Sequence, residues 1–318
     1  MKYTHLEKVD ITQLKVVCLI NPSAANRKWR RRRRLRRYLQ NNLPGELIDT
    51  HQDKQFTIQT TAALSHQKDV IIAAGGDGTI ADVIQGIMES QASPPPLLGI
   101  IPLGSGNAFR KSLGIPKVIP LAVKVLHQGY VREIDLIKFD GQVAGFTSLG
   151  ATAEVTFRKY RNPIPGLWGH IKEAFQMPHF SPWKIKLHLI DGLDSQGKKF
   201  NELTLEEEIF DCVINKTQHF GYSWKVSPFA KVDDGYLDIT LFQISGWQYL
   251  FTFPLNYLGI LQKYQKHFKA KKIHLQGKNL PLQYNGEPFN YCQNIHFEVL
   301  PRALKVICPP SSFKALIF

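Results

Sequence analysis

Residues 70–79, Val-Ile-Ile-Ala-Ala-Gly-Gly-Asp-Gly-Thr, join an apolar run to a glycine-rich turn. The β-branched run predicts a buried strand that stops at Gly75. From Ile80 onward, apolar residues recur at i, i+3, i+4, i+7 and i+8, which is the spacing of an amphipathic helix. Because Gly75, Gly76 and Gly78 have no Cβ, backbone N–H groups can approach an anion at the positive end of the helix dipole. The stretch therefore predicts a strand–turn–helix unit that can hold a phosphate.

A carboxylate, Asp77, lies inside this turn, just before Thr79. Without a partner it would repel a polyphosphate. Its presence therefore suggests a bridging Mg²⁺ ion, or a base that takes a proton from a hydroxyl. The alternative interpretation is a tight connection between strand and helix with no ligand.

A second small-residue turn, Leu103-Gly104-Ser105-Gly106-Asn107, follows the predicted strand 97–102 and precedes a predicted short helix over 108–113. If the two strands are parallel neighbours, both turns lie at the carboxyl edge of the sheet, where ligands bind in open α/β folds. The two turns together predict nucleotide phosphate binding. Neither matches the Gly-Lys-Ser/Thr of a Walker A loop or the G-x-G-x-x-G pattern.

Composition predicts a large core and a basic surface. The chain has 318 residues, 43% of them apolar, and a formal net charge of +14. Its length favours two domains. Four widely spaced cysteines without a C-x-x-C pair are typical of a reducing compartment. The polar N-terminus is not a signal peptide, and the chain contains no clean transmembrane stretch.

The positive charge is concentrated in residues 27–37, where nine of eleven side chains are basic. This run follows Asn21-Pro22 and is expected in the first helix. Such a surface favours a polyanion, and an anionic membrane is the expected partner, with nucleic acid as the less favoured alternative. A solvated helix face is a further alternative, and it is disfavoured because nine like charges repel one another. The apolar stretch 249–261 is either a core or surface helix, or an apolar lip that enters a membrane interface.

The hydrophobic pattern divides the chain into two domains. Residues 11–135 alternate strands and helices, which predicts a parallel sheet flanked by helices. From residue 136 onward, alternation with period two predicts a largely antiparallel β-sandwich. Four turn pairs favour hairpins there: Asp140-Gly141, Asp191-Gly192, Asp234-Gly235 and Asn285-Gly286. We therefore predict an α/β nucleotide-binding domain over 1–135 and a β-rich second domain over 136–303; the resemblance described next implies that this second domain binds a lipid substrate.

The two turns resemble the diacylglycerol kinase catalytic domain superfamily, which includes bacterial lipid kinases, sphingosine kinases and ceramide kinases. Other matching motifs are Asn21-Pro22, the stretch 227–238 (Ser-Pro-Phe-Ala-Lys-Val-Asp-Asp-Gly-Tyr-Leu-Asp) and Asn285-Gly286-Glu287. NAD kinases share the Gly-Gly-Asp-Gly-Thr turn and the general fold, but the later motifs are similar to the lipid branch. The resemblance implies an N-terminal α/β domain of the NAD kinase/diacylglycerol kinase type and a C-terminal β-sandwich domain. It also places the tail 304–318 back on the first domain.

The resemblance further implies ATP and Mg²⁺ as cofactors. It nominates the following ATP-contacting residues: Asn21, Thr50, Gly75, Gly76, Asp77, Gly78, Thr79, Gly104, Ser105, Gly106 and Asn107. The hydroxyl of Ser105 would bond a phosphate oxygen, or else cap the following helix. Gly104–Ala108 is more similar to the sphingosine kinase version of this loop, which favours a sphingoid base or another lipid alcohol as acceptor.

A structural Mg²⁺ site and a catalytic base are also implied. In bacterial members, main-chain oxygens matching Lys231 and Tyr236 and a carboxylate matching Asp234 hold the ion; a plain Asp-Gly turn is the alternative. Glu287 is the nominated base, and Asp77 is the second candidate. Asn285 departs from the family pattern, which has Asp there, and the loop after Asn21-Pro22 lacks the usual glycines.

The function expected from these observations is an ATP-dependent lipid kinase that phosphorylates a hydroxyl of a diacylglycerol-like or sphingoid lipid. Its expected location is the cytoplasm, peripherally bound to a membrane. A catalytically weakened lipid- or nucleotide-binding protein on the same fold is the first alternative, and an NAD kinase-like small-molecule kinase is the second.

Overall fold

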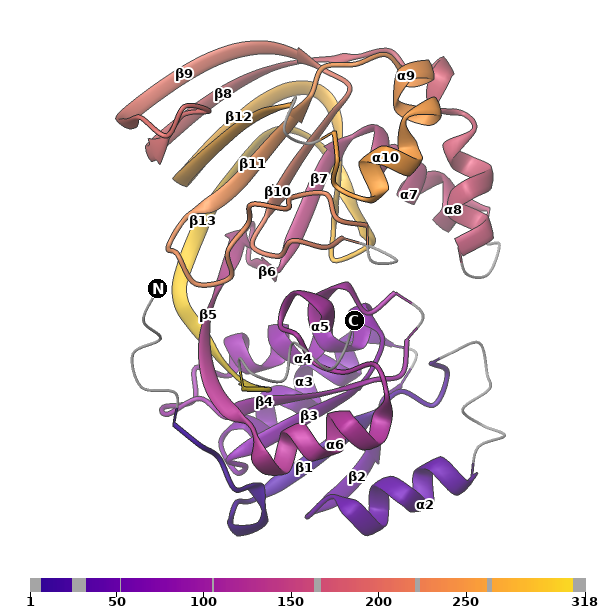
Figure 1. The fold of residues 1–318 in the computed structure, drawn as a ribbon, viewed down its shortest axis with the longest axis vertical. Helices are drawn as coiled ribbons and strands as arrows, with labels where there is room; N and C mark the ends of the chain where they lie inside the picture. The colour runs from indigo at the N-terminus through magenta and orange to yellow at the C-terminus, as the bar shows by residue number, and fades with distance from the viewer. Residues whose placement is uncertain are drawn as a thin grey trace. The chain divides into compact units, whose positions relative to one another are not determined.

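The computed structural model describes residues 7–24, 33–51, 53–104, 106–162, 167–220, 224–261 and 265–310 (Figure 1). The chain forms two compact units. The first comprises residues 1–134 together with 302–318, and the second comprises 135–301. Strands β5 (Tyr130–Phe139) and β13 (Glu287–Cys308) contribute residues to both units.

The first unit contains a parallel sheet in the order β13–β4–β3–β1–β2. Its strands are β1 (Val16–Ile20), β2 (Glu46–Asp49), β3 (Val70–Gly75), β4 (Leu97–Pro102) and the end of β13. β1 and β3 are buried along their whole length, as expected for strands covered on both faces. β3 and β4 are parallel neighbours, as predicted, and Val306 of β13 pairs with Leu98 of β4.

Helices flank this sheet. They are η1 (Ile11–Gln13), α2 (Arg33–Asn42), α3 (Lys54–Ser65), α4 (Asp77–Ser90), α5 (Ala108–Ser112) and α6 (Ile119–Gln128). Leu39 of α2 and Val123 and Leu126 of α6 share one buried cluster with Cys18 and Ile72 of the strands. α3 packs on α4, and α4 on β3. This is the helix-flanked parallel sheet that alternating strands and helices predict.

The second unit is built from antiparallel strands. They are β6 (Gln142–Ala144), β7 (Phe146–Gly150), β8 (Trp183–Leu193), β9 (Lys199–Ile209), β10 (Asp211–Asn215), β11 (Leu237–Phe242) and β12 (Lys266–Tyr284), with parts of β5 and β13. The long strand β12 pairs with β8, β11, β13 and β7 along its length. β10 pairs with β7 on one side and with β11 on the other.

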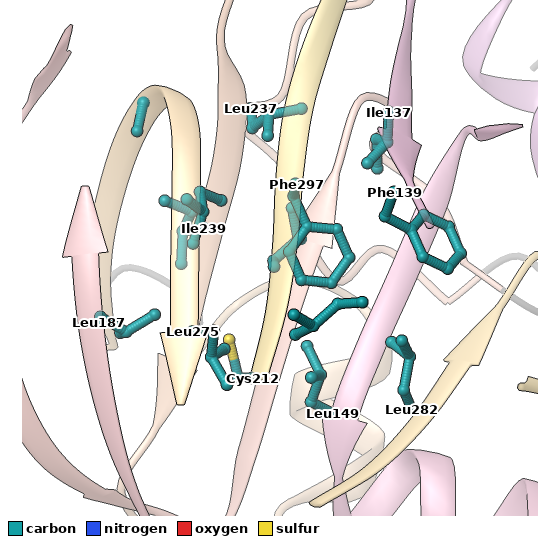
Figure 2. Packing of buried hydrophobic residues seen from close by; sticks show 14 of the residues in the cluster. Ile137, Phe139, Leu149, Leu187, Cys212, Leu237, Ile239, Leu275, Leu282 and Phe297 are labelled. Atoms are coloured by element: carbon teal, nitrogen blue, oxygen red, sulfur yellow. The ribbon is translucent and has the colours of Figure 1, made fainter. Parts of the chain in front are cut away.

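One apolar cluster fills this unit, and Figure 2 shows it from close by. Leu187 of β8, Cys212 of β10, Leu275 of β12 and Phe297 of β13 are all buried in it. β8 exposes alternate side chains, as its period-two sequence predicts. The helices of the unit are α7 (Ala151–Arg161), α8 (Leu167–Ala174), η2 (Met177–His179), α9 (Gly246–Phe251) and α10 (Phe253–Tyr257).

Two of the four predicted hairpin turns are present. Asp140-Gly141 connects β5 to β6 and Asn285-Gly286 connects β12 to β13, each with both residues at positive φ. The prediction for Asp191-Gly192 is wrong, because both residues lie inside β8 and the chain turns later, where the N–H of Gly197 donates to the carbonyl of Asp194. Asp234-Gly235 is not a two-residue hairpin either, since a long connection separates β10 from β11.

The basic run falls only partly within the described residues. α2 begins at Arg33 and contains the last basic side chains of the run; residues 27–32 lie outside the part of the chain that the structure describes. Arg33, Arg34 and Arg37 are exposed, whereas Arg36 forms an ion pair with Asp49.

Candidate functional site

The two glycine turns of the first unit meet at the carboxyl ends of β3 and β4. The N–H groups of Leu103 and Gly104 both donate to the carbonyl of Gly75, at 2.9 and 3.2 Å. The backbones are so close that a Cβ on Gly104 would lie 2.5 Å from the Cα of Gly76. Only glycine permits this approach, so the small residues that the sequence places here are required by the packing.

Asp77 fastens the two turns together. Its Oδ2 accepts a hydrogen bond from the N–H of Ala108 (3.1 Å), and its Oδ1 accepts one from the N–H of Phe109 (3.2 Å). Burial raises the pKa of Asp77, and the N–H donors oppose that shift. The backbone N–H of Asn107 is a third donor to this carboxylate. Two carboxylate oxygens have about four lone-pair sites, so one remains. Asp77 can therefore position the second loop while still accepting a proton or offering one oxygen to a cation.

Asn21 connects a third loop to the same place. Its amide Nδ2 donates to Thr79 Oγ1 (2.9 Å), while its Oδ1 accepts from the N–H of Ser23. Thr50, which follows β2, is buried, and its N–H donates to the carbonyl of Ile20. The predicted residues Asn21, Thr50 and Thr79 therefore share the carboxyl edge of one parallel sheet, where ligands of such sheets bind.

This edge is suited to an anion. Helix α4 begins at Asp77 after Gly76, which has no side chain to cap the first N–H groups, so these groups can donate to a ligand. Asn107 is fully buried, with its Nδ2 bonded to the carbonyl of Gly104. Ser105 lies outside the described residues. Gly106 and Gly78 belong to the same two turns.

In the second unit, Asn285, Gly286 and Glu287 form the tight turn between β12 and β13. Asn285 has a φ of 49°, in the left-handed region that asparagine tolerates. Its Oδ1 accepts from the N–H of Gly145 (3.0 Å), and its Nδ2 donates to the carbonyl of Val143 (3.4 Å). An aspartate could make the first of these bonds but not the second. The departure from the family pattern therefore has a structural use here.

Gln283, which sequence analysis missed, holds the same turn. Its Oε1 accepts from the N–H of Gly286 (3.0 Å), and its Nε2 donates to Ser148 Oγ (2.8 Å). The side chain is fully buried in β12. Glu287 is half-buried at the first position of β13. Glu287 belongs to the second unit, and Asp77, the other candidate base, belongs to the first.

The turn predicted to bind structural magnesium contains Asp234 and Tyr236, and the described structure places a lysine there. The Nζ of Lys216 donates to Asp234 Oδ1 at 2.8 Å and to the carbonyl oxygen of Tyr236. Two of the three predicted metal ligands thus accept hydrogen bonds from one ammonium group. No group of three or more His, Cys, Asp or Glu side chains suited to a metal occurs among the described residues. The observed donor set therefore does not fit the predicted Mg²⁺ ion.

Comparison with known proteins agrees with this architecture. Residues 15–139 match the model of the diacylglycerol kinase catalytic domain, and residues 169–308 match that of the YegS C-terminal NAD kinase beta sandwich-like domain. A Staphylococcus aureus protein named diacylglycerol kinase is 30% identical over 241 residues, covering 73% of this chain and 72% of its own. The chain belongs to the diacylglycerol kinase family.

Further relatives support the same assignment. A diacylglycerol kinase of Staphylococcus saprophyticus is 28% identical over 224 residues, covering 69% of this chain and 67% of its own. The crystal structure of a diacylglycerol kinase from Bacillus anthracis superposes with a TM-score of 0.71 at 23% identity, covering 94% of this chain and 98% of that one. This last likeness confirms the fold.

Membership of this family makes the chain a kinase, and a kinase of this family implies ATP as the phosphoryl donor. Sequence analysis missed Gln283 and Lys216 because neither belongs to a recognisable motif. The available signal was a lone lysine two residues after the apolar run 212–214, since a buried lysine needs a partner. Within the described residues, no helix is long and apolar enough to cross a membrane.

Proposed function

We propose that this member of the diacylglycerol kinase family is an ATP-dependent lipid kinase that transfers the γ-phosphoryl group to a lipid hydroxyl at an anionic membrane surface. The observation that carries the proposal is the junction of the two glycine turns through Asp77. That junction offers free N–H groups at the start of α4 and a carboxylate beside them. Phosphoryl transfer depends on such positioning of phosphates more than on covalent chemistry.

In this proposal each unit supplies a different part of the reaction. The turns around Gly76 and Gly104 bind the phosphates of ATP, and Asn21 orients Thr79 beside them. Asp77 would offer one carboxylate oxygen to a Mg²⁺ ion bound together with ATP, and such an ion would offset phosphate charge. Glu287 takes the proton of the acceptor hydroxyl from its fixed turn.

An exposed apolar surface supports membrane docking of the second unit. We call it the aromatic surface. It comprises the following exposed residues of α8, α9 and α10 and of the segments that follow α8 and α10: Trp168, Phe175, Trp247, Phe251, Phe253, Leu255, Leu258 and Ile260. The rings of Trp247 and Phe251 are stacked, with their centroids 5.8 Å apart. Trp247 is 57% exposed and Phe251 is 75% exposed. Exposed aromatic side chains of this kind are suited to the interface between lipid head groups and acyl chains.

The test is phosphoryl transfer from radiolabelled ATP to a lipid panel. Diacylglycerol and a sphingoid base are presented separately in anionic vesicles, with NAD in solution as a third acceptor. The proposal expects label in one lipid, and loss of that label on adding a chelator of Mg²⁺. Label in NAD alone would establish the small-molecule kinase instead. Binding of ATP without label in any acceptor would establish a binding protein.

A further inference from the structure

The long connection between β10 and β11 encloses a group of charges in the second unit, which we call the buried charge cluster. Its members are Asp135, Lys216, Asp234, Asp238 and Lys269. The side chains of Lys216 and Asp135 are each only 1% exposed. A charge so deeply buried is stable only when it is paired and hydrogen-bonded.

Lys216 has a full set of partners. Its Nζ lies 2.8 Å from Asp234 Oδ1 and 3.0 Å from Asp135 Oδ2, and it also donates to the carbonyl of Tyr236. An ammonium group has three N–H donors, and these are three oxygen acceptors. The backbone N–H of Lys216 is fixed as well, since it donates to the carbonyl of Gly145. The lysine is thus held at its backbone and at its charged end.

The acceptors are themselves held by the turn. The N–H of Gly235 donates to Asp135 Oδ2 (2.7 Å), and the N–H of Asp135 donates to the carbonyl of Val232 (2.7 Å). Asp135 therefore connects β5 to both sides of the turn, and Lys216 closes the arrangement from the end of β10. This is the task that a structural metal ion performs when its ligands come from distant parts of a chain.

A second lysine offsets part of the remaining negative charge. Lys269 Nζ lies 2.6 Å from Asp234 Oδ2 and 3.1 Å from Asp238 Oδ1. Both oxygens of Asp234 therefore face an ammonium group. Three carboxylates and two ammonium groups give the cluster a formal charge of −1 (−3 plus +2). If a divalent ion were added while both lysines remained, the formal charge of the buried charge cluster would become +1.

We propose that Lys216 is an internal cation that replaces a divalent metal ion in the turn between β10 and β11. Its Nζ takes the centre toward which Asp135, Asp234 and the Tyr236 carbonyl point. The distances are those of N–H···O bonds, whereas Mg²⁺ holds oxygen ligands at about 2.0–2.1 Å. The second unit then keeps its structure without a divalent ion. This inference does not depend on the proposed lipid kinase activity.

The first test uses the unaltered chain without nucleotide. Its melting temperature is measured after dialysis against EDTA and again with excess MgCl₂. The proposal expects the same melting temperature in both conditions, because the cation of the turn is covalently part of the chain. A lower melting temperature in EDTA that Mg²⁺ restores would overturn the proposal.

The second test removes the ammonium in two ways. Lys216→Ala leaves space between the carboxylates and should lower the melting temperature by roughly 10 °C, with partial recovery in MgCl₂. Lys216→Met removes the charge but keeps an apolar stem in the space, so it should lose stability without recovery. Mn²⁺ binding, followed by electron paramagnetic resonance, should show one more bound ion in Lys216→Ala than in the wild type.

Two results would contradict this second test. One is equal Mn²⁺ binding by the wild type and Lys216→Ala, which would mean that the ammonium does not occupy a cation site. The other is recovery of Lys216→Met by MgCl₂ to the same extent as Lys216→Ala. If neither variant folds, the chelation test on the wild type decides the matter without them.

Discussion

Asn285 shows how one residue can depart from a family pattern and still serve the same turn. Its amide donates to the carbonyl of Val143 and accepts from the N–H of Gly145, and these bonds connect the β12–β13 turn to β6 and to the residue that follows β6. The fixed turn then presents Glu287. The Asn285 amide therefore helps to position Glu287, the proposed base. This geometry does not indicate that the substitution impairs catalysis.

Asn285→Asp should therefore destabilise the protein. A carboxylate oxygen would replace Nδ2 beside the carbonyl of Val143, in a residue that is only 9% exposed. The expected loss is about 1–3 kcal/mol in the free energy of unfolding, measured by urea denaturation. Asn279→Asp is the matched control, since Asn279 also has a positive φ but is exposed. Equal effects of the two substitutions would contradict this role for the Asn285 amide.

Glu287→Gln should remove the base and leave the turn intact. If Glu287 accepts the hydroxyl proton, kcat in the labelled-ATP assay falls by roughly 10²-fold or more, with little change in melting temperature. Glu298→Gln, at an exposed position of the same strand, is the control and should keep full activity. Near-native turnover of Glu287→Gln would instead favour Asp77 as the base.

Asp211 makes stability depend on pH. It is fully buried, where its carboxylate accepts hydrogen bonds from Thr152 and Tyr249, and burial raises its pKa to about 7 from its ordinary value of 3.8. Between about pH 4 and pH 7 the folded protein keeps a proton that the unfolded chain releases. The stability from this group is thus complete below about pH 4 and is lost as pH rises through 7.

Urea denaturation across this pH range can isolate that contribution. Asp211→Asn carries no titrating proton, so the stability of wild type relative to the variant should fall from about pH 4 to about pH 7 and stay level above that. A constant difference between the two proteins would show that Asp211 does not change its protonation in this window.

At the scale of elements, the sequence predicts the strands, turns and helices whose formation depends on neighbouring residues of the chain. Strand β3, its turn and helix α4 follow from hydrophobic periodicity and glycine, and they lie where the sequence indicates. Asp191-Gly192 failed as a hairpin because pairing with β12 on one side and β9 on the other continues through it. The partners of Lys216 could not be predicted, because their contact depends on β5, β10 and β11 coming together, which leaves no periodic signal.

Helix α9 should contribute to membrane binding through the aromatic surface. Trp247→Ser combined with Phe251→Ser removes two exposed rings from a helix whose capping residue, Ser245, is unchanged. Binding to lipid vesicles, measured by co-sedimentation, should fall by roughly tenfold or more, since each ring loses buried apolar area. Phe56→Ser on α3, where the ring is 46% exposed, is the control and should bind normally. Equal binding by all three proteins would exclude α9 from the docking surface.

At the scale of the whole chain, the charge is unevenly distributed. The net charge is +14, and the run 27–37 accounts for nine positive side chains. In the second unit many basic residues are already paired with carboxylates, as in the ion pairs of Lys266 with Glu207 and of Lys272 with Glu298. The exposed arginines of α2 are therefore better placed to bind an anionic surface than the lysines of the β-rich unit.

Replacing Arg33, Arg34 and Arg37 by Gln should weaken binding to anionic vesicles by roughly 10–100-fold at low salt, since each basic side chain near such a surface contributes about 1 kcal/mol. Binding should also become less sensitive to added salt, because screening acts on the charges that were removed. The matched control replaces three exposed lysines of the second unit, Lys198, Lys199 and Lys278, by Gln. That variant has the same net charge, so equal losses in the two triple variants would mean that total charge, and not helix α2, determines membrane binding.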